Sequence, residues 1–181
     1  MDKIKILLVE DEVLMADIIR KQLISFGYDV FDVVDNGQDA IDKALSLNPD
    51  LILMDVILNG SMSGVQAAQK INSSSDIPII YLTAYSDEDT LKDSEKSEPY
   101  WYVFKPFESK ELHRNINMAL YKHRLEVDIK KSQTWFSTTL NSIGDAVICS
   151  DEEGRIKFMN PVAEKLTQIP LQKCVNGLFV D

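Results

Sequence analysis

The sequence predicts an α/β protein with a doubly wound, five-stranded parallel sheet, a long helix after it, and a partial α+β segment at the end. Three observations predict this architecture. Short apolar runs alternate with amphipathic helical stretches over residues 1–122. No Gly or Pro interrupts residues 107–143, which indicates continuous helix. A strand, a turn, a second strand and a helix start then follow from residue 145.

The five predicted strands are apolar runs typical of parallel strands that are covered on both faces. They occupy residues 4–9, 28–33, 51–56, 77–82 and 100–104. Because helical stretches separate them, each pair of strands forms a βαβ unit, which favours a parallel sheet with helices on both sides.

The predicted helices between the strands show apolar residues at helical spacing. In residues 13–26, which Gly27 ends, the apolar positions are Val13, Leu14, Ile18, Ile19, Leu23 and Phe26. In residues 38–47, which Asn48-Pro49 ends, they are Ala40, Ile41, Ala44 and Leu45. The remaining helices are expected at residues 64–71, 87–96 and 108–122.

Beyond residue 107 the pattern changes, because Leu112, Ile116 and Ala119 continue at helical spacing without a Gly or Pro. Alternating steps of four and three residues then form a narrow seam typical of a coiled coil, which comprises Leu125, Ile129, Ser132, Phe136 and Thr139. We therefore expect three regions: a domain at 1–122, a helical linker at 123–141, and a shorter segment at 142–181. The seam predicts a parallel homodimer, and the alternative is a fifth helix followed by a flexible linker.

Charge and hydropathy exclude several classes of protein. The net charge is −10, and residues 1–107 hold 9 basic and 19 acidic residues. A domain this acidic repels a phosphate backbone, so we expect no direct nucleic-acid binding. The longest apolar stretch, residues 51–58, is far shorter than the roughly 20 residues of a membrane-spanning helix. With no leader pattern at residues 1–4, a cytoplasmic location is expected.

The two cysteines, Cys149 and Cys174, lie in different predicted elements and form no CxxC pair. We interpret them as core thiols rather than as a disulfide or metal ligands.

Acidic and other polar side chains fall at strand ends. Glu10 and Asp11 follow the first strand, Asp55 closes the third, Thr83 ends the fourth and Lys105 ends the fifth, before Pro106. Ligands collect at this edge of a doubly wound sheet, so the three carboxylates are expected to converge and to bind a hard cation such as Mg²⁺. The alternatives are that the acids and Thr83 cap helices and that Lys105-Pro106 is an ordinary strand exit.

These residues, taken together, resemble the motifs of the response-regulator receiver family. The resemblance extends over residues 4–122 and rests on Glu10-Asp11, the strand that ends at Asp55, Thr83-Ala84 and Lys105-Pro106-Phe107. It implies a flavodoxin-like receiver fold and a phosphoacceptor switch of a two-component phosphorelay. The partner would be the phosphohistidine of a histidine kinase or phosphotransfer protein.

The resemblance also implies a role for each matching residue. Asp55 would be the phosphoacceptor, with Mg²⁺ held by Glu10, Asp11, Asp55 and the backbone carbonyl of Ile57. Lys105 would neutralise charge on the phosphoryl oxygens. Thr83 would bind one of those oxygens, and Tyr102 would turn from exposed to buried. The output face would comprise the fourth helix, the fifth strand and the fifth helix.

The loop at residues 56–64 departs from the family pattern. It lacks the proline often found four residues after the acceptor, and it is one residue longer than usual. Ile57 and Tyr85 are bulky at positions that influence access of the hydrolytic water in this family. We therefore expect slow self-dephosphorylation.

Two histidines, His113 and His123, lie on the predicted long helix. Neither has the neighbours of a histidine-kinase dimerisation motif, so they are interpreted as solvated helix positions.

The last segment resembles the beginning of a PAS sensor domain, on residues 143–148 and 158–164. Strands are expected at 146–149 and 155–159 around a turn at 151–154, and Asn160-Pro161 starts a helix over 162–167. Roughly 40 residues are too few to close such a domain, so we expect a truncated PAS module from a longer protein.

Three function classes follow. The first is a receiver that relays a conformational change to a PAS-containing output, or alternatively a receiver and PAS fragment of a hybrid sensor histidine kinase. We expect no independent enzyme here beyond self-phosphorylation and dephosphorylation. The second is an aspartyl phosphotransferase or phosphatase, although Ile57 stands where a haloacid-dehalogenase-like site has a second acid. The third is a flavodoxin-like nucleotide binder, which the absence of GxGxxG disfavours.

Overall fold

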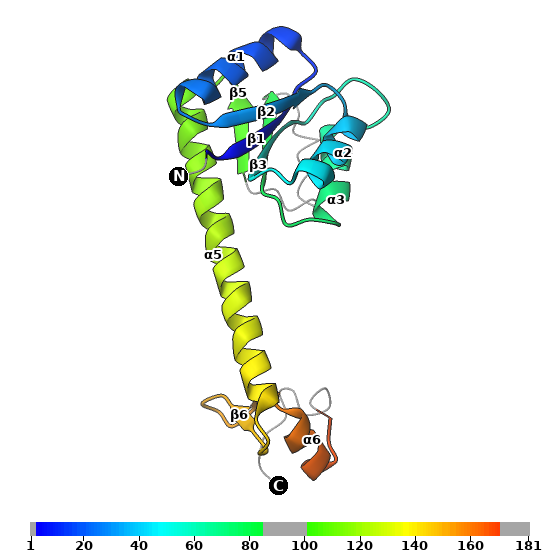
Figure 1. The fold of residues 1–181 in the computed structure, drawn as a ribbon, viewed down its shortest axis with the longest axis vertical. Helices are drawn as coiled ribbons and strands as arrows, with labels where there is room; N and C mark the ends of the chain where they lie inside the picture. Colours follow the sequence, from blue (N-terminus) through cyan, green and yellow to red (C-terminus); the bar gives the residue numbers. More distant parts are fainter. Residues whose placement is uncertain (1–2, 85–100, 171–181) are drawn as a thin grey trace. The chain divides into compact units, whose positions relative to one another are not determined.

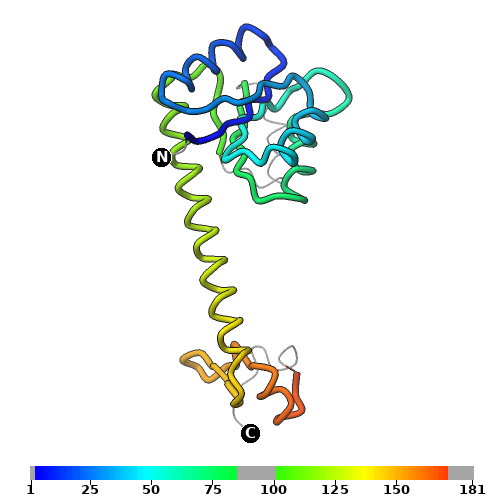
Figure 2. The backbone as a smooth tube through the Cα atoms, in the orientation of Figure 1, coloured from blue at the N-terminus to red at the C-terminus, as the bar shows by residue number. Residues whose placement is uncertain are grey.

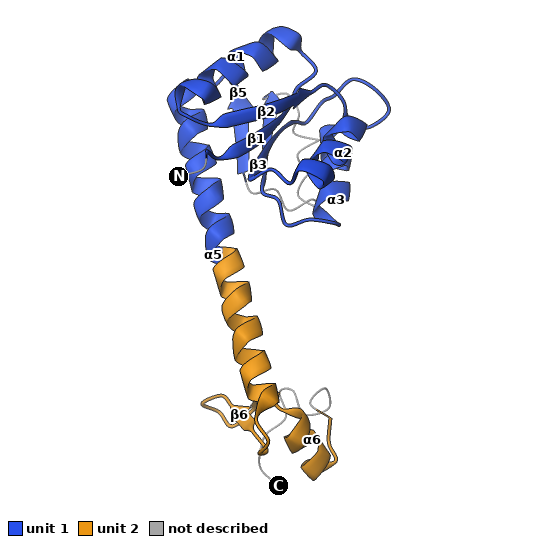
Figure 3. Ribbon diagram, in the orientation of Figure 1, with its two compact units in different colours: residues 1–125 blue, residues 126–181 orange. Residues whose placement is uncertain are grey.

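The computed structural model describes residues 3–84 and 101–170. The chain divides into two compact units, residues 1–125 and 126–181, and the division falls within one long helix (Figure 3). Each unit has its own cluster of buried apolar side chains.

The first unit contains a five-stranded sheet in the order β2-β1-β3-β4-β5, and every neighbouring pair is parallel (Figure 1). The strands are β1 (Lys5–Val9), β2 (Asp29–Val34), β3 (Leu51–Asp55), β4 (Ile79–Ala84) and β5 (Trp101–Lys105). The predicted sheet is therefore confirmed.

Helices cover both faces of this sheet. They are α1 (Val13–Ser25), α2 (Gly37–Leu47), α3 (Gly64–Asn72) and α5 (Ser109–Ser142). Buried residues of α1 and α5 pack on one face, whereas α2 and α3 lie side by side on the other (Figure 2). The helix predicted at 87–96 lies outside the described residues.

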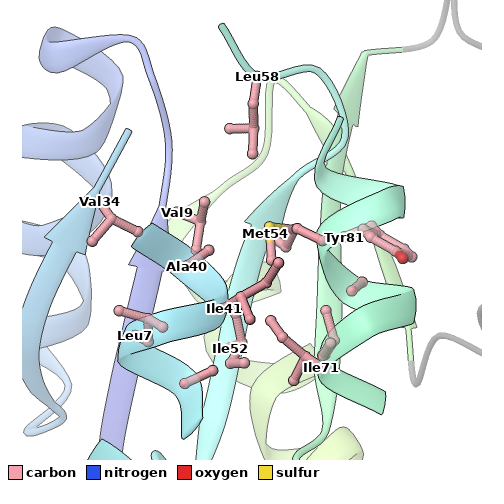
Figure 4. Close-up of a cluster of buried hydrophobic side chains, with 14 of the residues drawn as sticks. Leu7, Val9, Val34, Ala40, Ile41, Ile52, Met54, Leu58, Ile71 and Tyr81 are labelled. Atoms are coloured by element: carbon pink, nitrogen blue, oxygen red, sulfur yellow. The ribbon is translucent and has the colours of Figure 1, made fainter. Parts of the chain in front are cut away.

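Successive residues of a strand point to opposite faces, and β1 shows this directly. Leu7 and Val9 join the cluster beneath α2 and α3, which Figure 4 shows with Ile52 and Met54 of β3. Ile6 and Leu8 join the cluster beneath α1 and α5. The strands are buried on both faces, which explains their continuous apolar runs.

All five observed strands differ from the predicted ranges by one or two residues at one or both ends. β4 begins at Ile79 rather than at residue 77, because Pro78 has no N–H for the ladder; its carbonyl still accepts the Ile52 N–H at 3.0 Å. At its other end, β4 extends to Ala84 and includes Thr83. β5 ends at Lys105 rather than at residue 104, and Tyr100 lies outside the described residues.

The apolar surface of α1 is wider than the face that the sheet can cover. Ala16, Ile19 and Leu23 are buried, whereas Val13 and Leu14 are 78% and 74% exposed. Helical spacing identifies an apolar arc but does not show which part of that arc meets the sheet.

His113 is not a solvated position, contrary to the prediction. Its ring stacks on Phe26 with centroids 4.3 Å apart, and its Nδ1 lies 2.9 Å from the Tyr28 hydroxyl. These partners precede it by more than 80 residues, so the spacing within the helix contains no sign of them.

α5 runs without interruption over 34 residues and confirms the predicted long helix. Leu112, Ile116 and Ala119 are buried in the first unit, whereas Leu125, Ile129 and Phe136 are exposed. Of the helices in the described part of the chain, none is at once long and apolar enough to cross a membrane.

The second unit contains an antiparallel hairpin of β6 (Ile148–Ser150) and β7 (Ile156–Met159), followed by α6 (Pro161–Thr167). Ile156, Met159 and Ala163 form its apolar cluster. Asn160 caps α6 and is fully buried; its side chain accepts the N–H groups of Val147 and Ala163 and donates to the carbonyl of Asp145 at 2.8 Å. The predicted Asn-Pro helix start is confirmed. Cys149 is half-buried, and Cys174 lies outside the described residues.

Candidate functional site

The ends of β1 and β3 bring three carboxylates together. Val9 pairs with Met54 in the parallel ladder, so Glu10 and Asp55, one residue further on, are neighbours. The N–H of Glu10 donates to the Val34 carbonyl at 2.9 Å, which fixes the strand exit. One carboxylate oxygen from each of Glu10, Asp11 and Asp55 lies within 4.8 Å of the others. The predicted convergence of the acids is therefore observed.

Lys105 at the end of β5 reaches these carboxylates. Its Nζ lies 2.7 Å from Glu10 Oε2, 3.0 Å from Glu10 Oε1 and 2.6 Å from Asp55 Oδ2. β4 separates β5 from β3, so the extended lysine side chain has to span a strand to reach Asp55. Lys105-Pro106 is thus more than an ordinary strand exit.

Burial controls the electrostatics of this cluster. It is the main reason why the pKa of Glu10 is raised from 4.5 to about 7; the neighbouring charge of Asp55 adds to the rise and Lys105 opposes it. Burial alone would lower the pKa of Lys105, but its hydrogen bonds to Asp55 and Glu10 outweigh this and raise it. The ammonium therefore stays charged, and the site holds an excess of negative charge that a cation would relieve.

Asp11 accepts a hydrogen bond from the backbone N–H of Asn59, with a distance of 3.0 Å to Oδ2. The alternative that Glu10 and Asp11 cap the first helix is wrong. The N-cap of α1 is Glu12, and no side chain makes a capping hydrogen bond there.

The loop from β3 to α3 contacts the end of β3 closely. The N–H of Ile57 donates to Asp55 Oδ1 at 3.0 Å, and the Ile57 side chain is exposed. A Cβ atom at Gly64 would lie 1.8 Å from the carbonyl oxygen of Asp55, so only glycine fits. The predicted helix start at Gly64 is confirmed, but the sequence contains no local signal of this contact.

Thr83 and Tyr102 lie on the neighbouring strands. Leu82 of β4 pairs with Asp55, which places Thr83 one residue beyond the partner of Asp55. Thr83 is buried, and its hydroxyl donates to the Ala84 carbonyl at 3.3 Å. Tyr102 is half-buried and packs on Tyr81, with ring centroids 5.7 Å apart.

The donor set fits a magnesium ion. Mg²⁺ prefers oxygen ligands and is usually bound by one or two carboxylates with several waters, and this cluster offers three carboxylates. A cavity of about 340 Å³ between α1, β2 and α2 is lined in part by Glu10 and Asp11.

Known proteins with a similar sequence and fold are receiver domains. A family model for the response regulator receiver domain matches residues 6–117. The signal receiver domain of a modulated diguanylate cyclase from Desulfovibrio desulfuricans G20 is 40% identical, with 69% of this chain and 99% of that one covered and a TM-score of 0.66. The N-terminal domain of a response regulator/sensory box/GGDEF three-domain protein from Carboxydothermus hydrogenoformans is 35% identical, with coverage of 68% and 98% and a TM-score of 0.64.

A third similar structure is the receiver domain of a sensor histidine kinase from Pseudomonas aeruginosa PAO1. It is 31% identical, with 66% of this chain and 98% of that one covered and a TM-score of 0.61, and it has a magnesium ion in its active-site cleft. The present chain belongs to the response regulator receiver family. Its first unit is a receiver domain of two-component signalling, with a phosphoacceptor aspartate and an acidic cluster suited to Mg²⁺.

Proposed function

We propose that Asp55 is the phosphoacceptor and takes its phosphoryl group from a phosphohistidine on a histidine kinase or phosphotransfer protein. A carboxylate oxygen of Asp55 attacks phosphorus, an O–P bond forms, the P–N bond breaks, and the imidazole nitrogen leaves with the electron pair. The observation that best supports this assignment is the 2.6 Å contact between Asp55 Oδ2 and the Lys105 ammonium at the end of the sheet.

Glu10, Asp11, Asp55 and the backbone carbonyl of Ile57 are the proposed ligands of Mg²⁺. The bound ion would neutralise charge on the phosphoryl oxygens during transfer. The carboxylates of Glu10 and Asp55 already share the ammonium of Lys105, which supplies a second positive charge at the same place.

Thr83 and Tyr102 are proposed to carry the signal away from Asp55. The Thr83 hydroxyl would leave the Ala84 carbonyl for a phosphoryl oxygen, and Tyr102 would move from its half-buried position to a buried one. The contact of Tyr102 with Tyr81 supports this, because Tyr81 lies two residues before Thr83 on β4.

Phosphorylation by acetyl phosphate with Mg²⁺ tests the assignment. The wild-type protein should gain one phosphoryl group, measured by intact mass, and Asp55→Asn should gain none. Asp42→Asn, which removes an exposed carboxylate of α2, is the matched control and should react like the wild type. A phosphorylated Asp55→Asn variant would assign the acceptor elsewhere.

The second unit is proposed to be the start of a PAS module that receives this signal. The capped helix start at Asn160 and the hairpin before it support the assignment. The similar protein from C. hydrogenoformans combines a response regulator, a sensory box and a GGDEF domain, and the PAS-like segment here would correspond to that sensory box. A hybrid histidine kinase is the second candidate, since the similar P. aeruginosa receiver belongs to a sensor kinase.

We propose that α5 forms a parallel homodimer through its exposed apolar seam. Leu125, Ile129 and Phe136 are exposed on one continuous helix at coiled-coil spacing, which supports self-association. Ile129→Asp should shift the sedimentation equilibrium toward monomer, whereas Gln133→Asp, an exposed position outside the seam, should not. A wild-type protein that is monomeric at every concentration, phosphorylated or not, contradicts the proposal.

The phosphorylated form is proposed to be long-lived. The Ile57 side chain is bulky, and its N–H contacts Asp55 Oδ1, so it stands beside the carboxylate that water would have to approach. Tyr85, the second bulky position, lies outside the described residues. Decay of the phosphorylated form measures this lifetime, and a lifetime of only seconds would contradict it.

A further inference from the structure

We propose that the backbone amide of Asn59 is a positioning group for the metal site. It holds the carboxylate of Asp11 in place before a cation binds. The inference rests on the proposed function, in which Asp11 is a ligand of Mg²⁺.

The contact joins the two sides of the site. Asp11 follows β1, Asn59 lies in the loop after β3, and the Asn59 N–H donates to Asp11 Oδ2 at 3.0 Å across 48 residues of sequence. Glu10 and Asp55 are held by the Lys105 ammonium. Asp11 is held by the Asn59 N–H of the loop, so the three carboxylates are oriented by two separate contacts, one with an ammonium and one with a backbone amide.

The loop is fixed well enough to orient a carboxylate. Leu58, the residue before Asn59, is buried in the cluster beneath α2 and α3. Met62 packs against the same cluster, and a Cβ atom added to Gly37 at the start of α2 would lie 3.1 Å from its Sδ. The N–H of Gly64 donates to the Val56 carbonyl at 3.0 Å, which closes the base of the loop.

The start of α3 adds a further restraint. The Ser63 hydroxyl accepts the N–H of Gln66, and the Gln66 side chain accepts the N–H of Ser63, so both sides of a capping box are present. Asn59 therefore lies in a short exposed stretch that is anchored at both ends, by the buried Leu58 before it and by Met62 and the capped start of α3 after it.

A hydrogen bond of this kind influences metal affinity in a known direction. A partner outside the coordination shell orients the ligand, and its loss typically costs about 10-fold to 100-fold in affinity. Asp11 is only half-buried, so we expect the lower end of this range. The donor is a backbone N–H, and proline is the natural residue that lacks one. The side chain of Asn59 is not part of the contact.

Because the contact uses the backbone N–H of Asn59 and not its side chain, two substitutions at this position can separate the two groups. Asn59→Pro removes the donor, whereas Asn59→Ala keeps it and removes only the side chain. Titration with Mg²⁺ by calorimetry should give an affinity about tenfold weaker for Asn59→Pro and close to wild type for Asn59→Ala. With acetyl phosphate, Asn59→Pro should need more Mg²⁺ for half-maximal phosphorylation but reach the same rate at saturation. A merely structural disturbance of the loop would also lower the saturated rate.

The outcomes separate the inference from the proposed function. If the wild-type protein does not bind Mg²⁺, the proposed metal site is wrong. If it does, equal affinity in Asn59→Pro, or an equal loss in both variants, overturns the role of the amide. Should Asn59→Pro fail to fold, hydrogen exchange of the wild-type protein without Mg²⁺ decides: slow exchange of the Asn59 amide is expected, and exchange at the rate of an unstructured chain overturns the inference.

Discussion

The sheet of residues 1–125 is enclosed by two layers of apolar side chains, whereas the described part of residues 126–181 contains three buried apolar side chains and one buried amide. In the first unit, Glu10, Asp55 and Thr83 are buried at the carboxyl ends of the strands. In the second, the buried polar group is Asn160, which binds backbone groups before and after the hairpin. Apolar burial encloses the receiver sheet, and its buried polar groups lie together at one edge, whereas the buried amide of the second unit binds backbone groups.

The largest effect should come from the receiver core. Leu53 of β3 is fully buried, so Leu53→Ala should reduce the free energy of unfolding by about 3 kcal/mol. Urea unfolding followed by far-ultraviolet circular dichroism measures this loss. Met159→Ala, the matched change in the second unit, should leave the receiver transition where it is. A receiver transition that shifts equally with Met159→Ala would show that the two units do not have separate cores.

The next effect tests the amide of the second unit. Asn160→Ala leaves the N–H groups of Val147 and Ala163 and the carbonyl of Asp145 without their partner, which should cost about 2 kcal/mol. Hydrogen exchange resolved by segment should show faster exchange over β6, β7 and α6 and no change over β1 and β3. Unchanged exchange in the hairpin would mean that the apolar cluster alone stabilises this unit.

A smaller, pH-dependent effect should appear at Glu10. Its pKa of about 7 lies above the ordinary 4.5, so the folded protein binds this proton more tightly than the unfolded chain does. The resulting stabilisation is complete below pH 4.5 and is lost as the pH rises through 7. Without Mg²⁺, unfolding free energies measured at pH 5 and pH 8 should therefore differ, with the protein less stable at pH 8.

Glu10→Gln removes the titrating carboxyl, so the difference in unfolding free energy between pH 5 and pH 8 should shrink by about 1 to 2 kcal/mol. This is less than the full shift in the pKa of Glu10 implies, because the substitution also removes the ion pair of Glu10 with Lys105. Glu12→Gln, an exposed neighbour, is the control and should keep the wild-type dependence. The same pH dependence in Glu10→Gln and in the wild type would assign the proton to another group.

The smallest effect concerns the contact between α5 and the turn after α1. His113→Ala removes the stack on Phe26 and the partner of the Tyr28 hydroxyl, which should cost about 1 kcal/mol. Thermal unfolding measures it, and Lys110→Ala, exposed on the same helix, should leave the melting temperature unchanged. No loss in His113→Ala would show that the stack is energetically neutral.

The sequence predicted the sheet and four of the site residues because both depend on local patterns. Continuous apolar runs indicate covered strands, and parallel strands place Glu10, Asp11, Asp55 and Lys105 at one edge whatever the loops between them do. Other features depend on contacts between distant segments. The apolar spacing of α1 does not tell which residues meet the sheet, and nothing near His113 in sequence reveals Phe26.

The loop after Asp55 also makes contacts that local sequence patterns do not reveal. Its unusual length and missing proline were visible in the sequence, but their consequences were not. The need for glycine at position 64 arises from the carbonyl of Asp55, and the proposed role of Asn59 arises from an N–H that a proline at this position would lack. Side-chain chemistry gives no sign of a contact made by the backbone.

The ion pair of Lys105 has a consequence for the resting protein. Because its ammonium already touches both Glu10 and Asp55, an incoming phosphoryl group meets an occupied lysine. If Asp55 is phosphorylated as proposed, activation is an exchange of partners and not a simple addition, because the Lys105 ammonium would leave the Asp55 carboxylate for the phosphoryl oxygens. In the resting receiver, the Lys105 ammonium supplies the positive charge that a bound cation would otherwise supply. It thereby reduces the repulsion between the carboxylates of Glu10 and Asp55 before phosphorylation.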